Sequence, residues 1–333
     1  MTLQELKQTL VDASLVVVLT DENVAPLWIP ELKHWLACEE AMEIVIPGGE
    51  QSKTLAMAQR IWKKLLRRHA DRDTILVNLG GGVITDLGGF VASCYQRGIR
   101  FVNVPTTLLA MVDAAIGGKT GVDFNGGKNQ IGTFAEPLEV LVSPIYLSTL
   151  PQREILSGLA EMLKYGYVAD SSMLNVNMGN YEQYLLRAGR IKREIVALDP
   201  TDHGERMVLN FGHTLGHAIE SWSLANDHPL RHGEAVALGM GCALWISHML
   251  TGLSDAVVQD YWPKMRALLA EAEFTLGGDD LDEVLSFLTC DKKSHLGENR
   301  FVLLRSTGAP VIDQAVPDEL VRQSLLEVID KLS

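Results

Sequence analysis

Short apolar runs alternate with amphipathic stretches over the first 150 residues of this 333-residue chain. The runs are rich in Val, Ile and Leu, as expected for strands that are covered on both faces. Five of them are expected strands: 15–19, 43–46, 74–79, 101–104 and 139–142. Stretches between them, such as 53–68, have the spacing of a helix. Strands that alternate with helices predict a mostly parallel, Rossmann-like α/β sheet.

After about residue 150 the apolar positions recur at helical spacing. The expected helices are 152–165, 182–196, 206–222, 233–249, 255–272 and 318–332, and only 301–304 and 310–312 look extended. Leu150-Pro151 is the expected boundary between an α/β domain, 1–150, and a largely α-helical domain, 151–333. We expect the active site in the interdomain cleft, where ligand sites are common.

Composition excludes several classes of function. The net charge of −13 argues against sequence-independent nucleic-acid binding, which neutralises phosphates, although a local cluster of cations can still bind a small anion. No apolar run approaches the roughly 20 residues that span a membrane, and no secretory signal is visible. The four cysteines form no C-x-x-C pair. We therefore expect a cytoplasmic protein with no nucleic-acid or membrane partner.

A glycine turn, Gly80-Gly81-Gly82, follows the apolar run 74–79. It is not the G-x-G-x-x-G fingerprint, because Val83-Ile84-Thr85 comes next. Glycines let the backbone approach a ligand closely, and the N–H groups of a following helix favour an anion. Asp86 could meet a ribose or nicotinamide group. A tight packing turn with a capping aspartate explains the stretch equally well.

The stretch 104–132 contains Gly117-Gly118-Lys119-Thr120 and Lys128-Asn129. It is not a P-loop, because Asp113 stands where the first glycine is required and an apolar, helix-like run precedes it. Two lysines and an asparagine on glycine-rich backbone suit a phosphate or a carboxylate. Either lysine alone would be explained as an exposed, solvated residue.

Residues with the chemistry of metal ligands occur in the second half of the chain. His213 and His217 are one helical turn apart, and the stretch 206–222 also places Arg206 and Asn210 on their helix. Thr214 follows His213, so the H-E-x-x-H motif of a zinc peptidase is absent. Three of four residues plus water would make an open, catalytic-type metal site: Glu161, His213, His217 and His232.

In this order, these stretches resemble the 3-dehydroquinate synthase family of sugar-phosphate cyclases. The resemblance rests on PTTLL, GGKTG, GKN, GLAE-x-x-KYG, R-x-x-LNFGHT-x-GHA-x-E and HGEAVA, and it covers most of the chain. It implies a lyase of the shikimate pathway, which serves aromatic amino acid and chorismate biosynthesis. The implied reaction converts 3-deoxy-D-arabino-heptulosonate 7-phosphate to 3-dehydroquinate and phosphate by transient oxidation with NAD, phosphate elimination, re-reduction, ring opening and aldol closure. NAD and a divalent metal, zinc or alternatively cobalt, are the implied cofactors.

The resemblance also implies a role for each matching residue. Glu161, His213 and His232 would bind the metal, which leaves His217 beside the substrate. The substrate site would comprise Asp113, Lys119, Lys128, Asn129, Lys164, Lys192, Arg206, Asn210, His217 and one of Lys292 or Lys293. NAD would lie on Asp21, Asn23, Glu50, Lys53, Gly81, Gly82, Asp86, Thr106, Thr107, Asp113, Lys119, Lys128, Thr149 and Leu150. Arg97 would reach the phosphate in the neighbouring subunit, which implies a homodimer.

Other functions stay open at this point. A cyclase of the 2-deoxy-scyllo-inosose or 2-epi-5-epi-valiolone synthase type acts on a substrate without a carboxylate, and Lys192 with Arg206 favours a substrate that has one. A metal-dependent polyol dehydrogenase would not need the set of lysines. A non-catalytic paralogue is disfavoured because every matched polar position carries a competent residue. Thr85 stands where the family usually has glycine, and the sequence leaves its effect on the glycine turn open.

Overall fold

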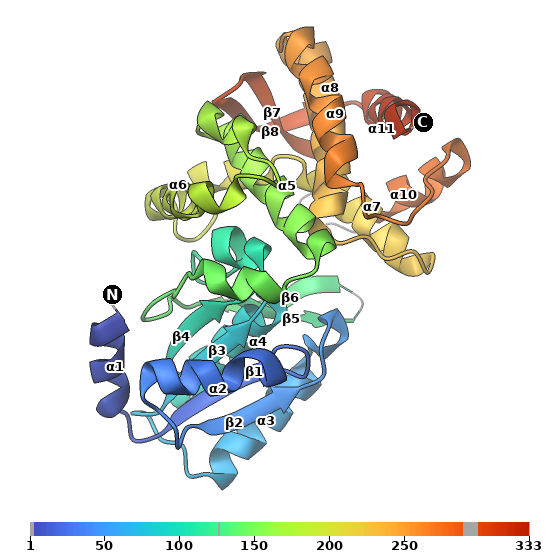
Figure 1. The fold of residues 1–333 in the computed structure, drawn as a ribbon. Helices are drawn as coiled ribbons and strands as arrows, with labels where there is room; N and C mark the ends of the chain where they lie inside the picture. Colours follow the sequence, from blue (N-terminus) through green and yellow to red (C-terminus); the bar gives the residue numbers. More distant parts are fainter. Residues whose placement is uncertain (1–2, 126, 289–298, 333) are drawn as a thin grey trace. The chain divides into compact units, whose positions relative to one another are not determined.

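The chain folds into two compact units, Met1–Leu150 and Pro151–Ser333 (Figure 1). The computed structural model describes residues 3–125, 127–288 and 299–332. Lys292 and Lys293, of which one is expected at the substrate site, lie outside the described residues.

A four-stranded parallel sheet forms the centre of the first unit, with strand order β2-β1-β3-β4. The strands are β1 (Val16–Asp21), β2 (Met42–Ile46), β3 (Ile75–Gly80) and β4 (Arg100–Pro105). All six residues of β3 are buried, which is why its sequence is an almost continuous apolar run. The predicted parallel, Rossmann-like sheet is confirmed.

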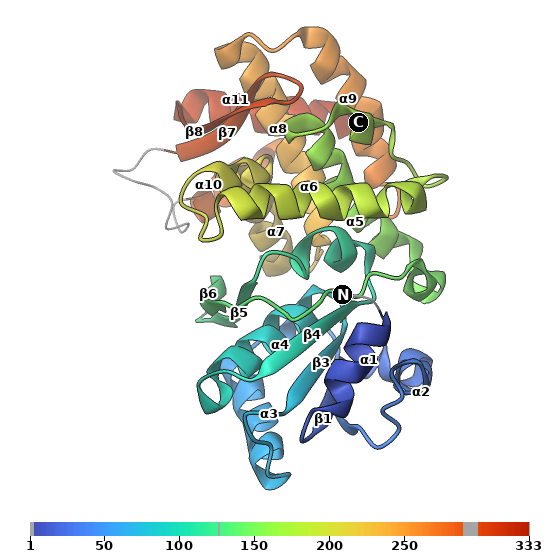
Figure 2. The same ribbon diagram turned by 90° about the vertical axis from the view of Figure 1, so that its left-hand side faces the viewer.

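Helices cover both faces of this sheet. They are α1 (Leu3–Val11), α2 (Ala25–Leu36), α3 (Leu55–Arg67) and α4 (Gly82–Cys94). Val17 and Leu19 of β1 pack with α3 and α4 in one apolar cluster. The alternate residue, Val18, faces the other side of the sheet, where Figure 2 shows α1 and α2.

An antiparallel hairpin of β5 (Lys119–Phe124) and β6 (Gly127–Phe134) follows the sheet, and the sequence pattern did not predict it. Short helical turns complete the unit: η1 (Glu50–Ser52), η2 (Tyr95–Arg97), the π-helix η3 (Ala110–Ala114) and η4 (Pro144–Thr149). The strand expected at 139–142 is wrong. The stretch forms an isolated parallel bridge, Val140 with Asn103 of β4, in which Asn103 N–H donates to Glu139 and Leu141 N–H donates to Asn103.

The second unit is built from helices and one hairpin, as predicted. Its helices are α5 (Gln152–Val168), α6 (Leu185–Leu198), α7 (His213–Ala225), α8 (His232–Thr251), α9 (Asp255–Leu268), α10 (Leu281–Leu288) and α11 (Asp318–Leu332). Short turns are η5 (Ser171–Asn175), η6 (Tyr181–Tyr184), η7 (Glu205–Asn210) and η8 (Gly278–Asp280), and β7 (Asn299–Ser306) pairs with β8 (Ala309–Val316).

One expected helix is interrupted. The stretch 206–222 divides into η7 and α7 at Gly212, whose φ of 79° lies in the left-handed region. Arg206 and Asn210 therefore lie on a separate turn and not on the helix of His213. The apolar spacing continues across the break, so periodicity alone did not reveal it.

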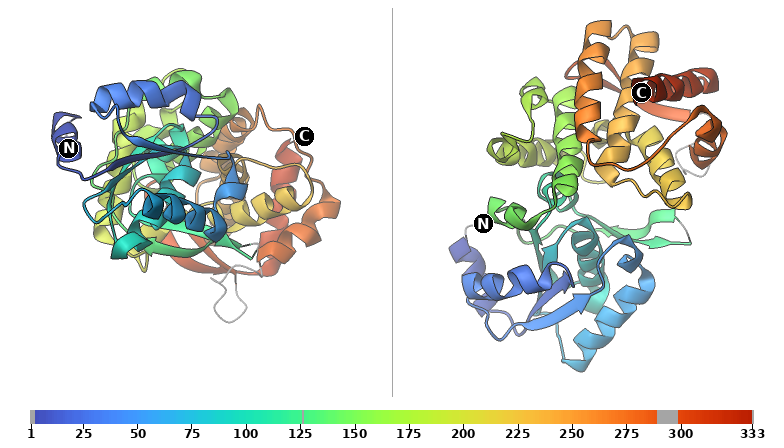
Figure 3. Two further views of the ribbon diagram at one scale, coloured as in Figure 1. Left: turned by 90° about the horizontal axis from the view of Figure 1, so that it is seen from below. Right: turned by 45° about the vertical axis from the view of Figure 1, so that its right-hand side comes forward.

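Helix α8 is the central helix of the second unit, and α5, α7, α9, α11 and β7 all pack against it. Figure 3 shows the C-terminal helix α11 beside it. By length and composition α8 could cross a membrane, which corrects the expectation that no apolar run approaches that length. However, 78% of its 18-residue apolar window is buried inside the unit, as in a core helix.

Candidate active site

Many of the residues expected to bind NAD lie at the carboxyl ends of the four parallel strands. Asp21 ends β1, Glu50 and Lys53 follow β2, Gly81 follows β3 and Thr106 follows β4. In the sheet, β2 lies on one side of β1 and β3 lies on the other side. The edge between β1 and β3 is therefore a topological switch point, where open parallel sheets bind ligands.

The glycine turn joins β3 directly to α4, with Gly81 as the single residue between them. A Cβ atom on Gly81 would lie 2.9 Å from Cγ2 of Thr107, so the backbone is held close to the end of β4. The first N–H groups of α4 thus point to the edge where the strands end, as in an anion site at a helix N-terminus.

Thr85 does not crowd this turn. Its side chain is 2% exposed, and its hydroxyl donates a hydrogen bond of 3.1 Å to the carbonyl oxygen of Gly82. The extra atoms relative to glycine are therefore buried within the unit, which answers a question that the sequence left open.

Lys53 joins the segments that follow β2 and β3. Its ammonium group lies 2.7 Å from Oδ2 of Asp86 and 3.8 Å from Oε1 of Glu50. Burial lowers the pKa of Lys53, but these two carboxylates outweigh it and raise the pKa to about 12. Burial raises the pKa of Glu50, against the opposing charges of Lys53 and Lys128. The structure thus brings four residues predicted separately into one charged cluster.

Asp123 holds the β5–β6 hairpin against this cluster. Its backbone N–H donates to the carbonyl of Lys53 at 2.8 Å, and its Oδ1 accepts the N–H of Asn129 at 2.7 Å. The GGKTG and GKN stretches are therefore anchored next to the segment that follows β2. Sequence reasoning missed Asp123, although its place between the two motifs is a usable signal.

A buried pair of amides links the sheet to the stretch containing Asp113. Asn78 of β3 donates from Nδ2 to Oδ1 of Asn103 on β4 at 2.9 Å. Asn103 donates in turn to the carbonyl of Ala115 at 3.1 Å. Ala115 ends the π-helix that carries Asp113, so the pair fixes that helix relative to the glycine turn.

Other expected NAD residues have structural partners within the first unit. Oδ1 of Asp21 accepts the N–H groups of Asn23 at 2.9 Å and Val24 at 3.2 Å, just before α2 begins. The hydroxyl of Thr149 accepts a hydrogen bond of 3.0 Å from Nε1 of Trp28. Both residues are thus oriented without a ligand.

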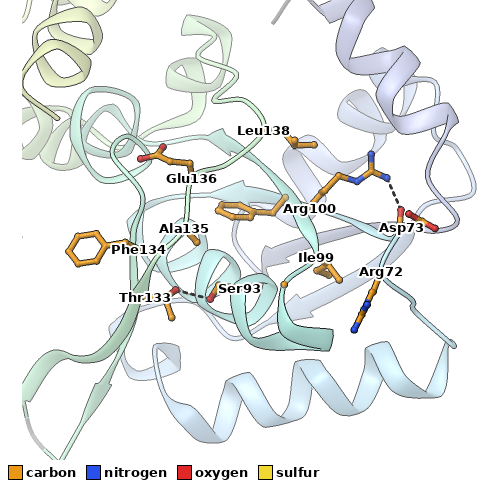
Figure 4. Close-up of a pocket in the computed structure, with 12 residues that line it drawn as sticks. Arg72, Asp73, Ser93, Ile99, Arg100, Thr133, Phe134, Ala135, Glu136 and Leu138 are labelled. Atoms are coloured by element: carbon orange, nitrogen blue, oxygen red, sulfur yellow. Dashed lines mark hydrogen bonds between the residues drawn. The ribbon is translucent and has the colours of Figure 1, made fainter. Parts of the chain in front are cut away.

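Arg97 lies at the other edge of the sheet, at the end of α4 that is distant from the glycine turn. It is exposed, with a φ of 68°. A surface pocket of about 860 Å³ lies at this edge (Figure 4), where Ser93 bonds Thr133 and Arg100 bonds the carbonyl of Asp73. None of the expected site residues lines it, so the pocket and the expected chemistry are separate.

In the second unit, Glu161 and two histidines converge. Nε2 of His213 and Nε2 of His232 each lie 3.5 Å from Oε1 of Glu161, while Lys164 contacts its other oxygen. The three ligand atoms lie within 4.8 Å of one another, and Glu161 is fully buried. One carboxylate and two imidazoles fit a divalent metal of borderline softness and leave a position for substrate or water.

Glycines bring the helices of these ligands together. A Cβ atom on Gly239 of α8 would lie 1.9 Å from the carbonyl oxygen of Gly212, and one on Gly233 would lie 1.9 Å from that of Ser157. Helices α7 and α5 therefore touch α8 at the backbone. His213 and His232 are the first residues of α7 and α8, so these contacts set their separation.

The two histidines have opposite electrostatic environments. Burial lowers the pKa of His213 well below its usual value, and the charge of Lys164 lowers it further. Burial also lowers the pKa of His232, but hydrogen bonds to Glu161 and Glu220 outweigh it and raise the pKa to about 10. Since a metal binds the neutral ring, it would have to displace the proton of His232.

Buried cations lie on α5, α6 and η7, three elements that pack on one another. Lys164, Lys192 and Arg206 are 1%, 6% and 2% exposed, respectively. Helix α6, which carries Lys192, packs on α5 and η7, and the guanidinium of Arg206 donates to the carbonyl of Pro200 at 2.9 Å. Buried cations of this kind require anionic or polar partners.

His217 and Glu220 lie one turn apart on α7. The His217 ring is 5.2 Å from the His213 ring and 5.9 Å from the His232 ring, and it is exposed. Glu220 is 5% exposed, and its Oε2 lies 3.5 Å from Nδ1 of His232. The sequence analysis gave Glu220 no role, although the GHA-x-E motif contains it.

An ion pair of two residues that the sequence analysis did not single out, Arg153 and Glu234, fixes the start of α8. The guanidinium of Arg153 binds Glu234 through two hydrogen bonds of 2.6 and 2.7 Å. Glu234 also accepts the N–H of Arg231 at 2.7 Å, which caps the helix just before His232. The N-terminus that carries His232 is therefore held from two sides.

The fold is that of the dehydroquinate synthase-like cyclases. The structure of 2-deoxy-scyllo-inosose synthase complexed with carbaglucose-6-phosphate, NAD+ and Co2+ matches with a TM-score of 0.84 at 23% identity, covering 95% of this chain and 91% of that chain. The structure of 2-epi-5-epi-valiolone synthase from Streptomyces hygroscopicus subsp. jinggangensis 5008, with NAD+ and Zn2+ bound, also has a TM-score of 0.84, with 27% identity and coverage of 96% and 92%.

Sequence comparison identifies the family within these cyclases. Residues 43–157 match the family model of the 3-dehydroquinate synthase N-terminal region, and 158–294 match that of the C-terminal region. The 3-dehydroquinate synthase of Blochmanniella floridana is 42% identical over 319 residues, which cover 90% of this chain and 85% of that protein. The chain therefore belongs to the 3-dehydroquinate synthase family, and the predicted resemblance is confirmed.

Proposed function

We propose that this chain catalyses the 3-dehydroquinate synthase reaction, which converts 3-deoxy-D-arabino-heptulosonate 7-phosphate to 3-dehydroquinate and phosphate. The observation that carries the proposal is the convergence of His213 and His232 on Glu161, with Lys164 on the same carboxylate, in a chain of this family. The enzyme would be a phosphate-eliminating carbon–oxygen lyase of the shikimate pathway.

NAD and a divalent metal are the proposed cofactors. The related cyclase structures contain NAD+ with Co2+ or Zn2+, which supports NAD and a divalent metal. We propose zinc as the metal, with cobalt as the alternative. Glu161, His213 and His232 would hold the metal, and the carboxyl edge of the sheet in the first unit would hold NAD. When bound, NAD would supply reversible hydride transfer, and the metal would polarise the alcohol and ketone oxygens as a Lewis acid.

The protein's own residues would orient the substrate for the successive steps. Lys192 and Arg206 suit the carboxylate, as buried cations near the predicted metal ligands, and Lys164 adds a third positive charge. The exposed imidazole of His217 lies beside the His213 and His232 rings, where it can exchange hydrogen bonds with a substrate hydroxyl. Fixing one substrate through several groups lowers the entropic barrier of each step.

The two alternatives are disfavoured by the same cations. A cyclase whose substrate lacks a carboxylate would have less use for the buried cations Lys192 and Arg206. A polyol dehydrogenase would need neither these residues nor Lys119 and Lys128. Both alternatives remain outcomes of the test below.

The remaining expectations belong to the proposal. The protein would be a cytoplasmic homodimer without nucleic-acid or membrane partners, and Arg97 would act on the phosphate in the neighbouring subunit. The position of Arg97 supports this, because it is distant from the glycine turn within its own unit.

The first prediction is a direct assay. Purified protein with NAD, zinc and 3-deoxy-D-arabino-heptulosonate 7-phosphate should release phosphate, while absorbance at the NADH band stays at its baseline. Accumulation of NADH would identify a dehydrogenase. Turnover of a sugar phosphate without a carboxylate, and none of this substrate, would identify a sister cyclase.

A further inference from the structure

His232 has a carboxylate at each of its ring nitrogens. Nε2 faces Oε1 of Glu161 at 3.5 Å, and Nδ1 faces Oε2 of Glu220 at 3.5 Å. Both carboxylates are buried, at 0% and 5% exposure. A buried carboxylate needs a hydrogen-bond donor, and Nδ1 of His232 is placed to be one for Glu220.

The position of Glu220 on α7 explains this contact. It follows His213 by seven residues, or two helical turns, so both side chains lie on the face of α7 that packs against α8. The residues around it, Ile219 and Ala218, are apolar and buried. The chain thus places a charged group in an apolar contact between helices, where an aliphatic residue would pack well.

Two functions are compatible with this geometry. Among the described residues, His217, Glu220 and His232 form a second group whose ligand atoms lie within 4.8 Å of one another. This group could hold a cation of its own, or it could support the first group. His232 belongs to both groups, and its neutral ring has only one proton.

The His232 ring, which both groups share, decides between a second cation site and a supporting role. When Nε2 is the ligand next to Glu161, the proton of the neutral ring is on Nδ1 and points to Glu220. A second cation on Nδ1 would have to displace that proton and convert His232 to an imidazolate. A hydrogen bond to Glu220 needs no such step, and carboxylate–histidine pairs of this kind orient metal ligands in other proteins.

We propose that Glu220 is a positioning residue that fixes the ring orientation and the Nδ1–H tautomer of His232, so that Nε2 is available to the metal. The inference rests on the proposed metal site and not on the identity of the substrate. Binding of metal without turnover would therefore count against the proposed reaction and leave this inference standing.

The test is metal affinity in the full-length protein. Metal-free wild type and Glu220→Gln, which keeps the shape but removes the charge, are titrated with Co2+ in competition with a chromophoric chelator. We expect Glu220→Gln to weaken the affinity about 10- to 100-fold, while the melting temperature of the metal-free protein stays at the wild-type value. Glu283→Gln is the matched control, because Glu283 also bonds to α7, through Trp222 and Asn226, but does not contact His232.

Three results would overturn the proposal: wild-type affinity in Glu220→Gln, an equal loss in Glu283→Gln, or two metal ions per wild-type chain of which Glu220→Gln loses one. A second measurement does not depend on the stability of a variant. Nitrogen-15 NMR of the metal-loaded wild type should show His232 protonated at Nδ1, and the opposite tautomer would refute the assignment.

Discussion

At the scale of single residues, His213 and His217 share a helical spacing but have different surroundings. The two side chains are one turn apart on α7, so the sequence pattern treats them as an equivalent pair. Only His213 presents Nε2 to Glu161, whereas His217 is exposed and groups with Glu220 and His232. The family resemblance implied this division, and helical periodicity alone left it open.

This difference gives the second prediction. His213→Ala should abolish tight metal binding, because it removes one of three converging ligand atoms, whereas His217→Ala should bind metal nearly as the wild type does. Equilibrium dialysis followed by metal analysis measures both variants side by side. Equal loss in both would contradict the ligand assignment.

The third prediction concerns pH. His232 has a pKa of about 10 in the metal-free protein and must lose its proton to bind metal, whereas His213 is already neutral. Metal affinity should therefore rise with pH, by roughly tenfold per unit between about pH 7 and about pH 9. Chelator competition across this range measures the slope. Affinity that stays constant with pH would show that His232 is already neutral.

At the scale of elements, local patterns predicted most of the fold. The four strands of the parallel sheet and α11 follow from apolar runs and helical spacing. The β5–β6 hairpin was missed because its glycines, lysines and asparagines lack the β-branched residues typical of strands. The break before α7 depends on one glycine at positive φ, which a periodic pattern does not register.

The fourth prediction tests the contact between α7 and α8. Gly239→Ala would place a methyl group 1.9 Å from the carbonyl oxygen of Gly212, so the helices must separate. We expect a loss of about 1–3 kcal/mol in the free energy of unfolding and weaker metal binding. Denaturant unfolding and metal titration measure the two effects.

Gly278→Ala is the control, because nothing lies within 4 Å of its Cβ position. It should leave both the free energy of unfolding and the metal affinity close to wild type. A Gly239→Ala protein as stable as the control would show that the helices tolerate a larger separation.

At the scale of the whole molecule, the expected chemistry is divided between two units. The switch point of the sheet and the charged cluster of Lys53 belong to the first, and the Glu161 cluster belongs to the second. Motifs on the sequence identified both sets through the family resemblance. The sequence did not reveal the contacts of Asn103 with Asn78, of Glu220 with His232 and of Glu234 with Arg153, because each joins elements that are separate in the chain.

The fifth prediction addresses the contribution of Arg97 across subunits. Arg97→Ala and His213→Ala homodimers should both be nearly inactive. Co-expression with random pairing gives mixed dimers as about half of all dimers, and one of the two sites in each combines an intact metal cluster with the partner's Arg97, so the mixture should regain about a quarter of the wild-type activity per site. Phosphate release by the mixture measures this. Activity no higher than in the separate variants would place Arg97 in the site of its own chain.

The backbone contacts of α8 have a consequence for how this protein can vary. The distance between two ligands normally depends on the volumes of the side chains packed between their helices. Where glycines bring main chains into contact, that distance depends on the van der Waals radii of the main-chain atoms instead. Apolar residues elsewhere in the second unit can then be exchanged, at a cost in stability, without displacing His213 from His232. Relatives could therefore diverge widely in their cores and still keep the same ligand geometry.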